Sequence, residues 1–291
     1  MHNLLILDGA MGTMLQAAGM KAGEHPEVFG FDNPEIVKNI HLKYIEAGSN
    51  IIYANTFGAN AHKLEGCKID VDTAIKTAIQ SAKEAVVESK RDVKVALDIG
   101  PIGELLEPLG VLRFEDAYDI YKEMVVAGEK YGADIVVFET FTDLYDVRAG
   151  VLAAKENTKL PVWVTMTYET TGRTFTGTKI ESMAVTLEGL GVDAIGFNCS
   201  LGPKEILPLA RKLKEWTTLP VIIKPNAGLP NPSTGEYDLH AEDFAKLMAE
   251  YKSLGISYAG GCCGTAPDFI KELKSELDAT EVKEVKSVKV K

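Results

Sequence analysis

The chain has 291 residues, of which 46% are apolar, and a formal net charge of −11 at pH 7. Its basic residues form no run within the globular part, so the excess negative charge would repel phosphate backbones and anionic lipid surfaces. These properties exclude nucleic acids and membranes as default partners and favour small molecules as ligands.

The amino-terminal residues give no sign of export. The segment 1–8 lacks a basic start and reaches the carboxylate of Asp8 after a few apolar residues, unlike a signal peptide. We therefore expect a cytoplasmic location. Four cysteines in that reducing compartment are more often metal ligands or reactive groups than disulfide partners.

Short apolar runs rich in Val and Ile recur along the chain. They are continuous rather than alternating, which is typical of parallel strands covered by helices. The predicted strands, in chain order, are 4–8, 51–54, 93–98, 134–139, 162–167, 194–199, 221–225 and 258–262.

Amphipathic stretches lie between these strands, and several begin at a first-turn proline or end at a glycine. The predicted helices are 34–47, 71–89, 114–131, 144–157, 181–190, 203–216, 241–254 and 267–277. Eight strands alternating with eight helices predict an α/β fold, a single (β/α)8 TIM barrel, over residues 1–277. Residues 278–291 lose this periodicity and are interpreted as a flexible charged tail, or alternatively as a tether to a further module or partner.

Three of the four cysteines lie at the ends of predicted strands, at the barrel end where active sites are built. Cys199 ends the sixth strand, and Cys262 and Cys263 lie at the end of the eighth, within a glycine-rich segment, 260–264. Glycines permit unusual backbone angles that would turn both sulfurs toward one point, and strand six lies close to strand eight. Three thiolates with a fourth position open are typical of a catalytic Zn²⁺ site.

The charge of the three thiolates limits the reactions that a zinc ion bound to them could support. Three thiolates outweigh the charge of Zn²⁺, so the ion would activate water poorly but could still deprotonate an exogenous thiol. We therefore predict that Cys199, Cys262 and Cys263 are metal ligands and catalytic residues that activate a substrate sulfur toward an electrophilic carbon. The alternative is that they are small buried residues. Cys67, in a loop after the second strand, is interpreted as incidental.

Several motifs at the strand ends resemble those of the homocysteine S-methyltransferase family, most closely the homocysteine-binding module of its cobalamin-dependent methionine synthases. Together they extend from the first strand to the eighth. The motifs are DGAMGT from Asp8, NTFGA from Asn55, DIGP from Asp98, FETF from Phe138, GFNCS from Gly196, PNAG from Pro225 and GGCCGT from Gly260.

The resemblance implies that the three cysteines bind Zn²⁺ and that the sulfur of L-homocysteine takes the open position beside Asn226. It also implies that Asp8 and Glu139 accept the substrate ammonium group, although Asp8 could instead cap a loop. Backbone N–H groups around Gly9, Ala10 and Thr56 would hold its carboxylate. Asp98 is left open between a loop-organising and a substrate-side role. His41, His62 and His240 are interpreted as surface or capping residues.

The methyl donor is not determined by these motifs. The cobalamin-loop pattern Asp-x-His-x-x-Gly is absent, because Asp238 and His240 are followed by Asp243 where glycine would stand. Cobalamin is therefore expected only indirectly, on a separate corrinoid protein or methyl-donor module. The alternatives are a small sulfonium or betaine donor, a chain that is a fragment of a larger protein, and a non-catalytic zinc- or thiol-binding docking subunit.

Overall fold

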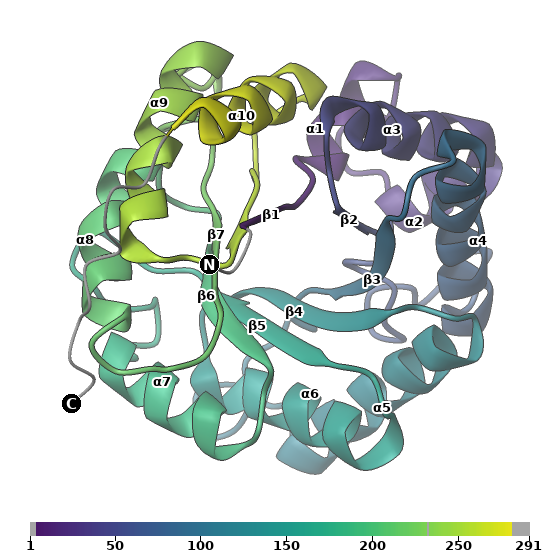
Figure 1. The fold of residues 1–291 in the computed structure, drawn as a ribbon. Helices are drawn as coiled ribbons and strands as arrows, with labels where there is room; N and C mark the ends of the chain where they lie inside the picture. Colours follow the sequence, from purple (N-terminus) through teal and green to yellow (C-terminus); the bar gives the residue numbers. More distant parts are fainter. Residues whose placement is uncertain (1–3, 232, 281–291) are drawn as a thin grey trace.

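A computed structural model describes residues 4–231 and 233–280 of the chain. Its strands are all parallel and join in the order β1-β8-β7-β6-β5-β4-β3-β2, with helices around the outside (Figure 1). This arrangement confirms the predicted single (β/α)8 barrel. The strands are β1 (Leu5–Ile6), β2 (Ile51–Tyr53), β3 (Lys94–Ile99), β4 (Ile135–Phe141), β5 (Val162–Met166), β6 (Ala194–Asn198), β7 (Val221–Lys224) and β8 (Tyr258–Ala259).

The helical ring follows the predicted pattern, with two additions before α3. The helices are α1 (Met11–Ala17), α2 (Pro26–Asp32), α3 (Pro34–Ala47), α4 (Val71–Ser89), α5 (Phe114–Lys130), α6 (Leu144–Asn157), α7 (Ile180–Gly189), α8 (Pro203–Leu213), α9 (Ala241–Ala249), the 3-10 helix η1 (Glu250–Leu254) and α10 (Pro267–Ala279). Neither α1 nor α2 was predicted, and the predicted helix 241–254 is divided between α9 and η1.

The last helix extends beyond the predicted domain boundary at residue 277, because α10 continues to Ala279. Most of the predicted tail, residues 281–291, lies outside the described residues. Within the described part of the chain, no helix combines the length and apolarity needed to cross a membrane.

The barrel closes between β1 and β2 through few contacts. One bridge joins Leu7 to Ile51, and the Asn50 N–H donates to the Ile6 carbonyl oxygen over 2.7 Å. The Asn50 side chain also accepts from the Ile6 N–H at 2.9 Å. This junction is the seam of the barrel.

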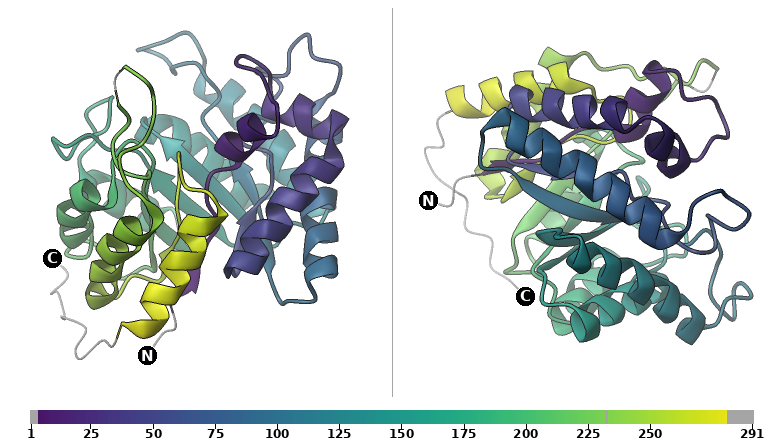
Figure 2. Two further views of the ribbon diagram at one scale, coloured as in Figure 1. Left: turned by 90° about the horizontal axis from the view of Figure 1, so that it is seen from above. Right: turned by 90° about the vertical axis from the view of Figure 1, so that its right-hand side faces the viewer.

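An apolar layer fills the barrel interior. Ala96, Val137, Trp163 and Ile222 belong to this buried cluster, and the rings of Trp163 and Tyr258 lie 4.2 Å apart. Successive side chains of a strand alternate between its two faces, so the residue two positions later also faces the interior. By this rule the inner positions at the strand ends are polar: Asp98, Glu139, Thr165, Asn198 and Lys224. The loops after the strands rise from this same end (Figure 2).

A buried carboxyl in the helical ring makes the fold sensitive to pH. Asp146 of α6 is 5% exposed and accepts a hydrogen bond of 2.8 Å from the Tyr121 hydroxyl. Burial raises the pKa of the Asp146 carboxyl to about 7. The folded chain therefore keeps this proton between about pH 4 and pH 7, where the unfolded chain has lost it, so its stability falls as pH rises through that window.

Replacing Asp146 by asparagine should remove this pH-dependent loss of stability. The amide needs no proton, and its oxygen can still accept a hydrogen bond from the Tyr121 hydroxyl. We expect the free energy of unfolding of Asp146→Asn to exceed that of the wild type at pH 8 by up to about 4 kcal/mol, with the gain shrinking toward pH 4. Urea unfolding at several pH values measures it. The exposed substitution Glu115→Gln is the control, and a gain independent of pH would contradict the assignment.

Candidate functional site

Three cysteine sulfurs converge at the carboxyl ends of the strands. The Sγ atoms of Cys199, Cys262 and Cys263 all lie within 4.8 Å of one another, and no other group of three or more His, Cys, Asp or Glu within the described residues does so. Thiolates about 2.3 Å from a tetrahedral zinc ion lie about 3.8 Å apart. The distance from Cys199 Sγ to Cys263 Sγ is 3.8 Å, so the set fits zinc. Cys67 packs against the hydrophobic core instead.

The chain places these sulfurs through loops rather than regular strand. Cys199 and Ser200 both have φ of +61°, in the left-handed region that non-glycine residues seldom adopt. β8 ends at Ala259, so strand alternation does not apply to the cysteine pair. The loop after β7 holds that pair: the Cys262 N–H donates to the Pro225 carbonyl, and the Ala227 N–H donates to the Cys263 carbonyl.

The role predicted for the glycines needs correction. Of Gly260, Gly261 and Gly264, only Gly264 has a left-handed backbone, with φ of +80°. The other two are required by close approach, since a Cβ on Gly260 would lie 2.7 Å from the Asp8 carbonyl oxygen and one on Gly261 2.3 Å from Thr265 Oγ1. Among the cysteines themselves the unusual backbone angle belongs to Cys199.

Asn198, which is fully buried, links the cysteines to neighbouring strands. Its Oδ1 accepts from the Thr140 N–H and the Thr165 hydroxyl, both at 2.8 Å. Its Nδ2 donates to Thr140 Oγ1 at 2.7 Å and faces Cys262 Sγ at 3.9 Å. The side-chain amide is thus fixed on both sides and points a donor at one sulfur.

The three sulfurs cannot all lose their protons without a cation between them. Hydrogen bonds from Cys199 and Cys262 lower the pKa of the Cys263 thiol to about 3. Contacts with Cys199 and Cys263, together with burial, raise the pKa of the Cys262 thiol. Ionisation of one sulfur thus opposes ionisation of its neighbours, and a bound cation is what would let all three ionise.

A buried ionic cluster occupies the neighbouring strand ends. Lys224 Nζ lies 3.2 Å from Asp8 Oδ1, 3.6 Å from Glu139 Oε2 and 3.5 Å from the centre of the Tyr53 ring. Burial raises the pKa of both carboxyls, and Lys224 opposes that effect. Asp98 Oδ1 has no hydrogen-bond partner among the described residues, and burial beside Glu139 raises the pKa of the Asp98 carboxyl. The sequence analysis missed Lys224, although its position two residues after the inward-facing Ile222 could have revealed it.

Two of the predicted carboxylate donors are already engaged. The Ala10 N–H donates to the Thr265 carbonyl at 3.0 Å, and the Thr56 N–H donates to the Ala54 carbonyl at 2.7 Å. Both bonds hold loops in place, and a carboxylate-binding role for the N–H groups around Gly9, Ala10 and Thr56 stays a prediction. Asn226 is buried and lies in the chain between Pro225 and Ala227, whose backbone groups hold the cysteine pair. Its Oδ1 has no hydrogen-bond partner among the described residues.

The histidines differ from their predicted roles at one position. His41 is fully buried, not exposed, because it lies on the inner face of α3 with Val37 and Tyr44. Burial lowers the pKa of its imidazole to about 4. His62 lies 3.7 Å from Glu104, and His240 precedes α9 without a side-chain capping bond.

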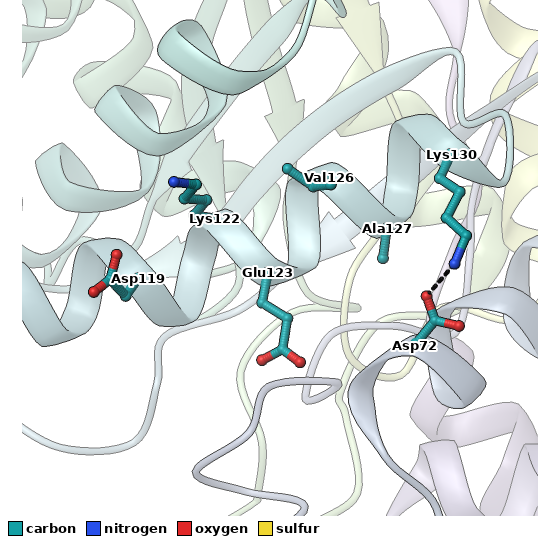
Figure 3. Close-up of a pocket in the computed structure, with 7 residues that line it drawn as sticks. All are labelled: Asp72, Asp119, Lys122, Glu123, Val126, Ala127 and Lys130. Atoms are coloured by element: carbon teal, nitrogen blue, oxygen red, sulfur yellow. Dashed lines mark hydrogen bonds and ion pairs between the residues drawn. The ribbon is translucent and has the colours of Figure 1, made fainter.

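A second concavity lies on the outer helices. Figure 3 shows charged side chains along α5 beside the first turn of α4, with Lys130 Nζ 2.8 Å from Asp72. This groove is formed by helix surfaces rather than by strand ends, and it contains none of the predicted site residues.

Comparisons with known proteins agree with the fold and the motifs. A model of the homocysteine S-methyltransferase family matches residues 5–277. The chain is 34% identical over 301 residues to methionine synthase of Mycobacterium leprae and 33% identical over 299 residues to that of Mycobacterium tuberculosis. These alignments cover 95% of the chain but 24% and 25% of the relatives, so the chain spans about a quarter of their length.

Solved structures of the homocysteine methyltransferase MmuM from Escherichia coli have the same fold. The oxidized form aligns with a TM-score of 0.82 at 23% identity, covering 94% of this chain and 95% of that one. The metallated form aligns with a TM-score of 0.79 at 22% identity, covering 94% and 96%.

Proposed function

Because the chain belongs to the homocysteine S-methyltransferase family, we propose that it transfers a methyl group to the sulfur of L-homocysteine and so forms methionine. The observation that carries this proposal is the convergence of three cysteine sulfurs beside a buried carboxylate cluster at one end of the barrel. The cysteine sulfurs could serve the reacting sulfur of the substrate, and the carboxylate cluster could serve the amino-acid end of the same molecule.

Cys199, Cys262 and Cys263 are the proposed zinc ligands, with Asn226 beside them. Zinc bound there would lower the pKa of a substrate thiol while leaving its sulfur electron-rich. Asn198 supports the set because its amide faces Cys262 Sγ. A fixed sulfur position favours reaction because the substrate need not search for the attacking geometry.

Asp8 and Glu139 are the proposed acceptors for the substrate ammonium group, and a backbone donor near Gly9 is proposed for its carboxylate. Within the part of the chain that the structure describes, Glu139 Oε2 and Asp98 Oδ1 are buried without a hydrogen-bond partner, although Glu139 Oε2 lies 3.6 Å from Lys224 Nζ. Buried acceptors that lack a donor are costly, so a cationic ligand is a natural partner for them. Ala10 and Thr56 would contribute by holding the loops.

The proposed donor is a methylcorrinoid protein or a methylfolate-linked cobalamin module. The relatives of similar sequence are methionine synthases. Apolar side chains on the loops after β3 and β5 are also exposed: Leu109 by 67%, Val111 by 78% and Phe175 by 73%. Because loops after the strands belong to the end of the barrel that carries the cysteines, these side chains are the proposed contacts of a macromolecular donor.

The function is tested by following methionine formation from homocysteine with zinc-loaded protein. We expect turnover with methylcobalamin or a methylated corrinoid protein, and none with S-methylmethionine or betaine. Methionine formed from a sulfonium alone would overturn the donor assignment. Absence of both zinc binding and turnover with every donor would overturn the proposed function.

Charged substitutions on the exposed loops should separate docking from chemistry. We expect Leu109→Asp with Val111→Asp to raise the KM for a methylated corrinoid protein by about 10-fold or more, as loss of an apolar anchor does at interfaces. Turnover with free methylcobalamin should not change. The matched control is Val87→Asp on α4, at a side chain that is 77% exposed but lies on the helical ring. Equal losses with both donors would contradict this docking surface.

A further inference from the structure

Lys224 places a cation inside the mouth of the barrel. Its side chain is only 4% exposed, and its ammonium group lies 3.2 Å from Asp8 and 3.6 Å from Glu139. It also lies 3.5 Å from the centre of the Tyr53 ring, whose face attracts cations. A buried lysine is costly unless it is paired, so these contacts fix where the ammonium group can stand.

The cluster holds more acceptors than Lys224 can satisfy. Asp8 has both oxygens engaged, since Oδ1 faces Lys224 and Oδ2 accepts from the Tyr53 N–H at 2.7 Å. Glu139 Oε2 is 3.6 Å from Lys224, too far for a hydrogen bond, and Asp98 Oδ1 has no hydrogen-bond partner within residues 4–231 and 233–280. Two carboxyl groups thus pair with one lysine, a third lies close enough to interact electrostatically with it, and Glu139 and Asp98 each keep an oxygen without a hydrogen bond.

We infer that Lys224 is a positioning residue for the amino-acid substrate. Its ammonium group holds Asp8 against Tyr53 and draws Glu139 inward, so that the remaining lone pairs of Asp8 and Glu139, with Asp98 Oδ1, can accept the substrate ammonium group. Lys224 acts through these carboxyl groups, because its ammonium group is already paired with Asp8 and Glu139. This inference rests on the proposed function and adds to it a basis for preferring thiols that carry an ammonium group.

Without the lysine, two buried carboxylates would face each other with no cation between them. Like charges in one small site repel, so the carboxyls would separate or take up a proton, and either change weakens a site for ammonium. The sulfur site should be little affected, because this segment contacts it through backbone bonds that a side-chain substitution keeps: the Cys199 N–H donates to the Lys224 carbonyl, and the Cys262 N–H donates to the Pro225 carbonyl. Loss of Lys224 should therefore affect the amino group of the substrate selectively.

The test compares two thiols that differ only in the ammonium group, homocysteine and 4-mercaptobutanoate. Binding of each to zinc-loaded wild type, Lys224→Met and Lys224→Arg is measured by calorimetry, with zinc content determined in parallel. For Lys224→Met we expect the Kd of homocysteine to rise about 10- to 100-fold, as for loss of a charge-assisted hydrogen bond. The Kd of 4-mercaptobutanoate should change less than about twofold, with zinc content unaltered. Lys224→Arg should recover part of the preference.

The matched control is Lys63→Met, because Lys63 lies near the same mouth but donates to the Pro101 carbonyl, and it should leave the preference intact. If Lys224→Met does not fold, Lys224→Gln keeps a donor without the charge and should shift the preference in the same direction. Equal weakening of both thiols, or no weakening of homocysteine, overturns the inference alone. Failure of the wild type to bind either thiol overturns the proposed function, and the inference with it.

Discussion

The Cys199→Ser variant is expected to lose stoichiometric zinc and methyl transfer while the barrel stays folded. Cys199 supplies one of three sulfurs, and a serine hydroxyl neither ionises at neutral pH nor matches the preference of zinc for thiolate. Changes in groups that merely support a metal ligand cost 10- to 100-fold in affinity, so loss of a ligand should weaken zinc binding by more than about 100-fold. Metal analysis after dialysis and methionine formation measure the two effects.

The control for this substitution is Cys67→Ser, which removes a thiol that packs on the core away from the cluster. It should keep one zinc per chain and full turnover. Serine at position 199 must adopt the same left-handed backbone as cysteine, so the comparison isolates the sulfur. A Cys199→Ser protein that retains one tightly bound zinc would remove the basis of the proposed function.

Replacing Asn198 by alanine should have the second large effect, on stability and metal affinity together. The substitution leaves the Thr140 N–H and the Thr165 hydroxyl without their acceptor in a fully buried position. Each unsatisfied buried group costs about 1–3 kcal/mol, so the free energy of unfolding should fall by about 2–5 kcal/mol. Zinc affinity should fall about 10- to 100-fold, because Cys262 loses its neighbouring donor.

Asn157→Ala is the matched control for Asn198→Ala. Asn157 also donates two side-chain hydrogen bonds, to the Tyr118 hydroxyl and the Ala153 carbonyl, but it lies at the end of α6. Its loss should lower stability without altering zinc affinity. Urea unfolding and competition with a zinc chelator measure the two quantities, and unchanged zinc affinity in Asn198→Ala would show that the amide has no influence on the cluster.

Local signals in the sequence were sufficient for most of the barrel. The bounds of α3, α4 and α6 agree with the predicted helices, because each has a periodic apolar face and a clear start signal. α3 begins at Pro34, and the side chains of Asp70 and Asp143 cap the starts of α4 and α6. α1 and α2 were missed because each has seven residues and neither has a side-chain cap at its start. Such short helices depend on packing against the barrel rather than on their own sequence.

The site was predictable to the extent that it follows the topology of the barrel. Placing Cys199 near Cys262 and Cys263 required only that strand ends share one rim. Lys224 was missed because β7 was recognised from its apolar residues alone. That the Lys224 side chain faces the barrel interior follows only from the alternation of side chains along the strand. The Ala10 N–H donates to the distant Thr265 carbonyl, a tertiary contact that no local pattern specifies, whereas the Thr56 N–H is engaged locally, by the Ala54 carbonyl.

The sparse closure between β1 and β2 has a consequence for how substrate and fold influence each other. Asp8 follows β1, and its carboxylate accepts from the N–H of Tyr53 in β2, so a group in the substrate cluster also ties the seam. We expect a ligand that contacts this cluster to bind only the closed barrel. Its binding free energy therefore stabilises the junction between β1 and β2. Backbone amides beside the seam should accordingly exchange with solvent deuterium more slowly once an amino-acid thiol is bound.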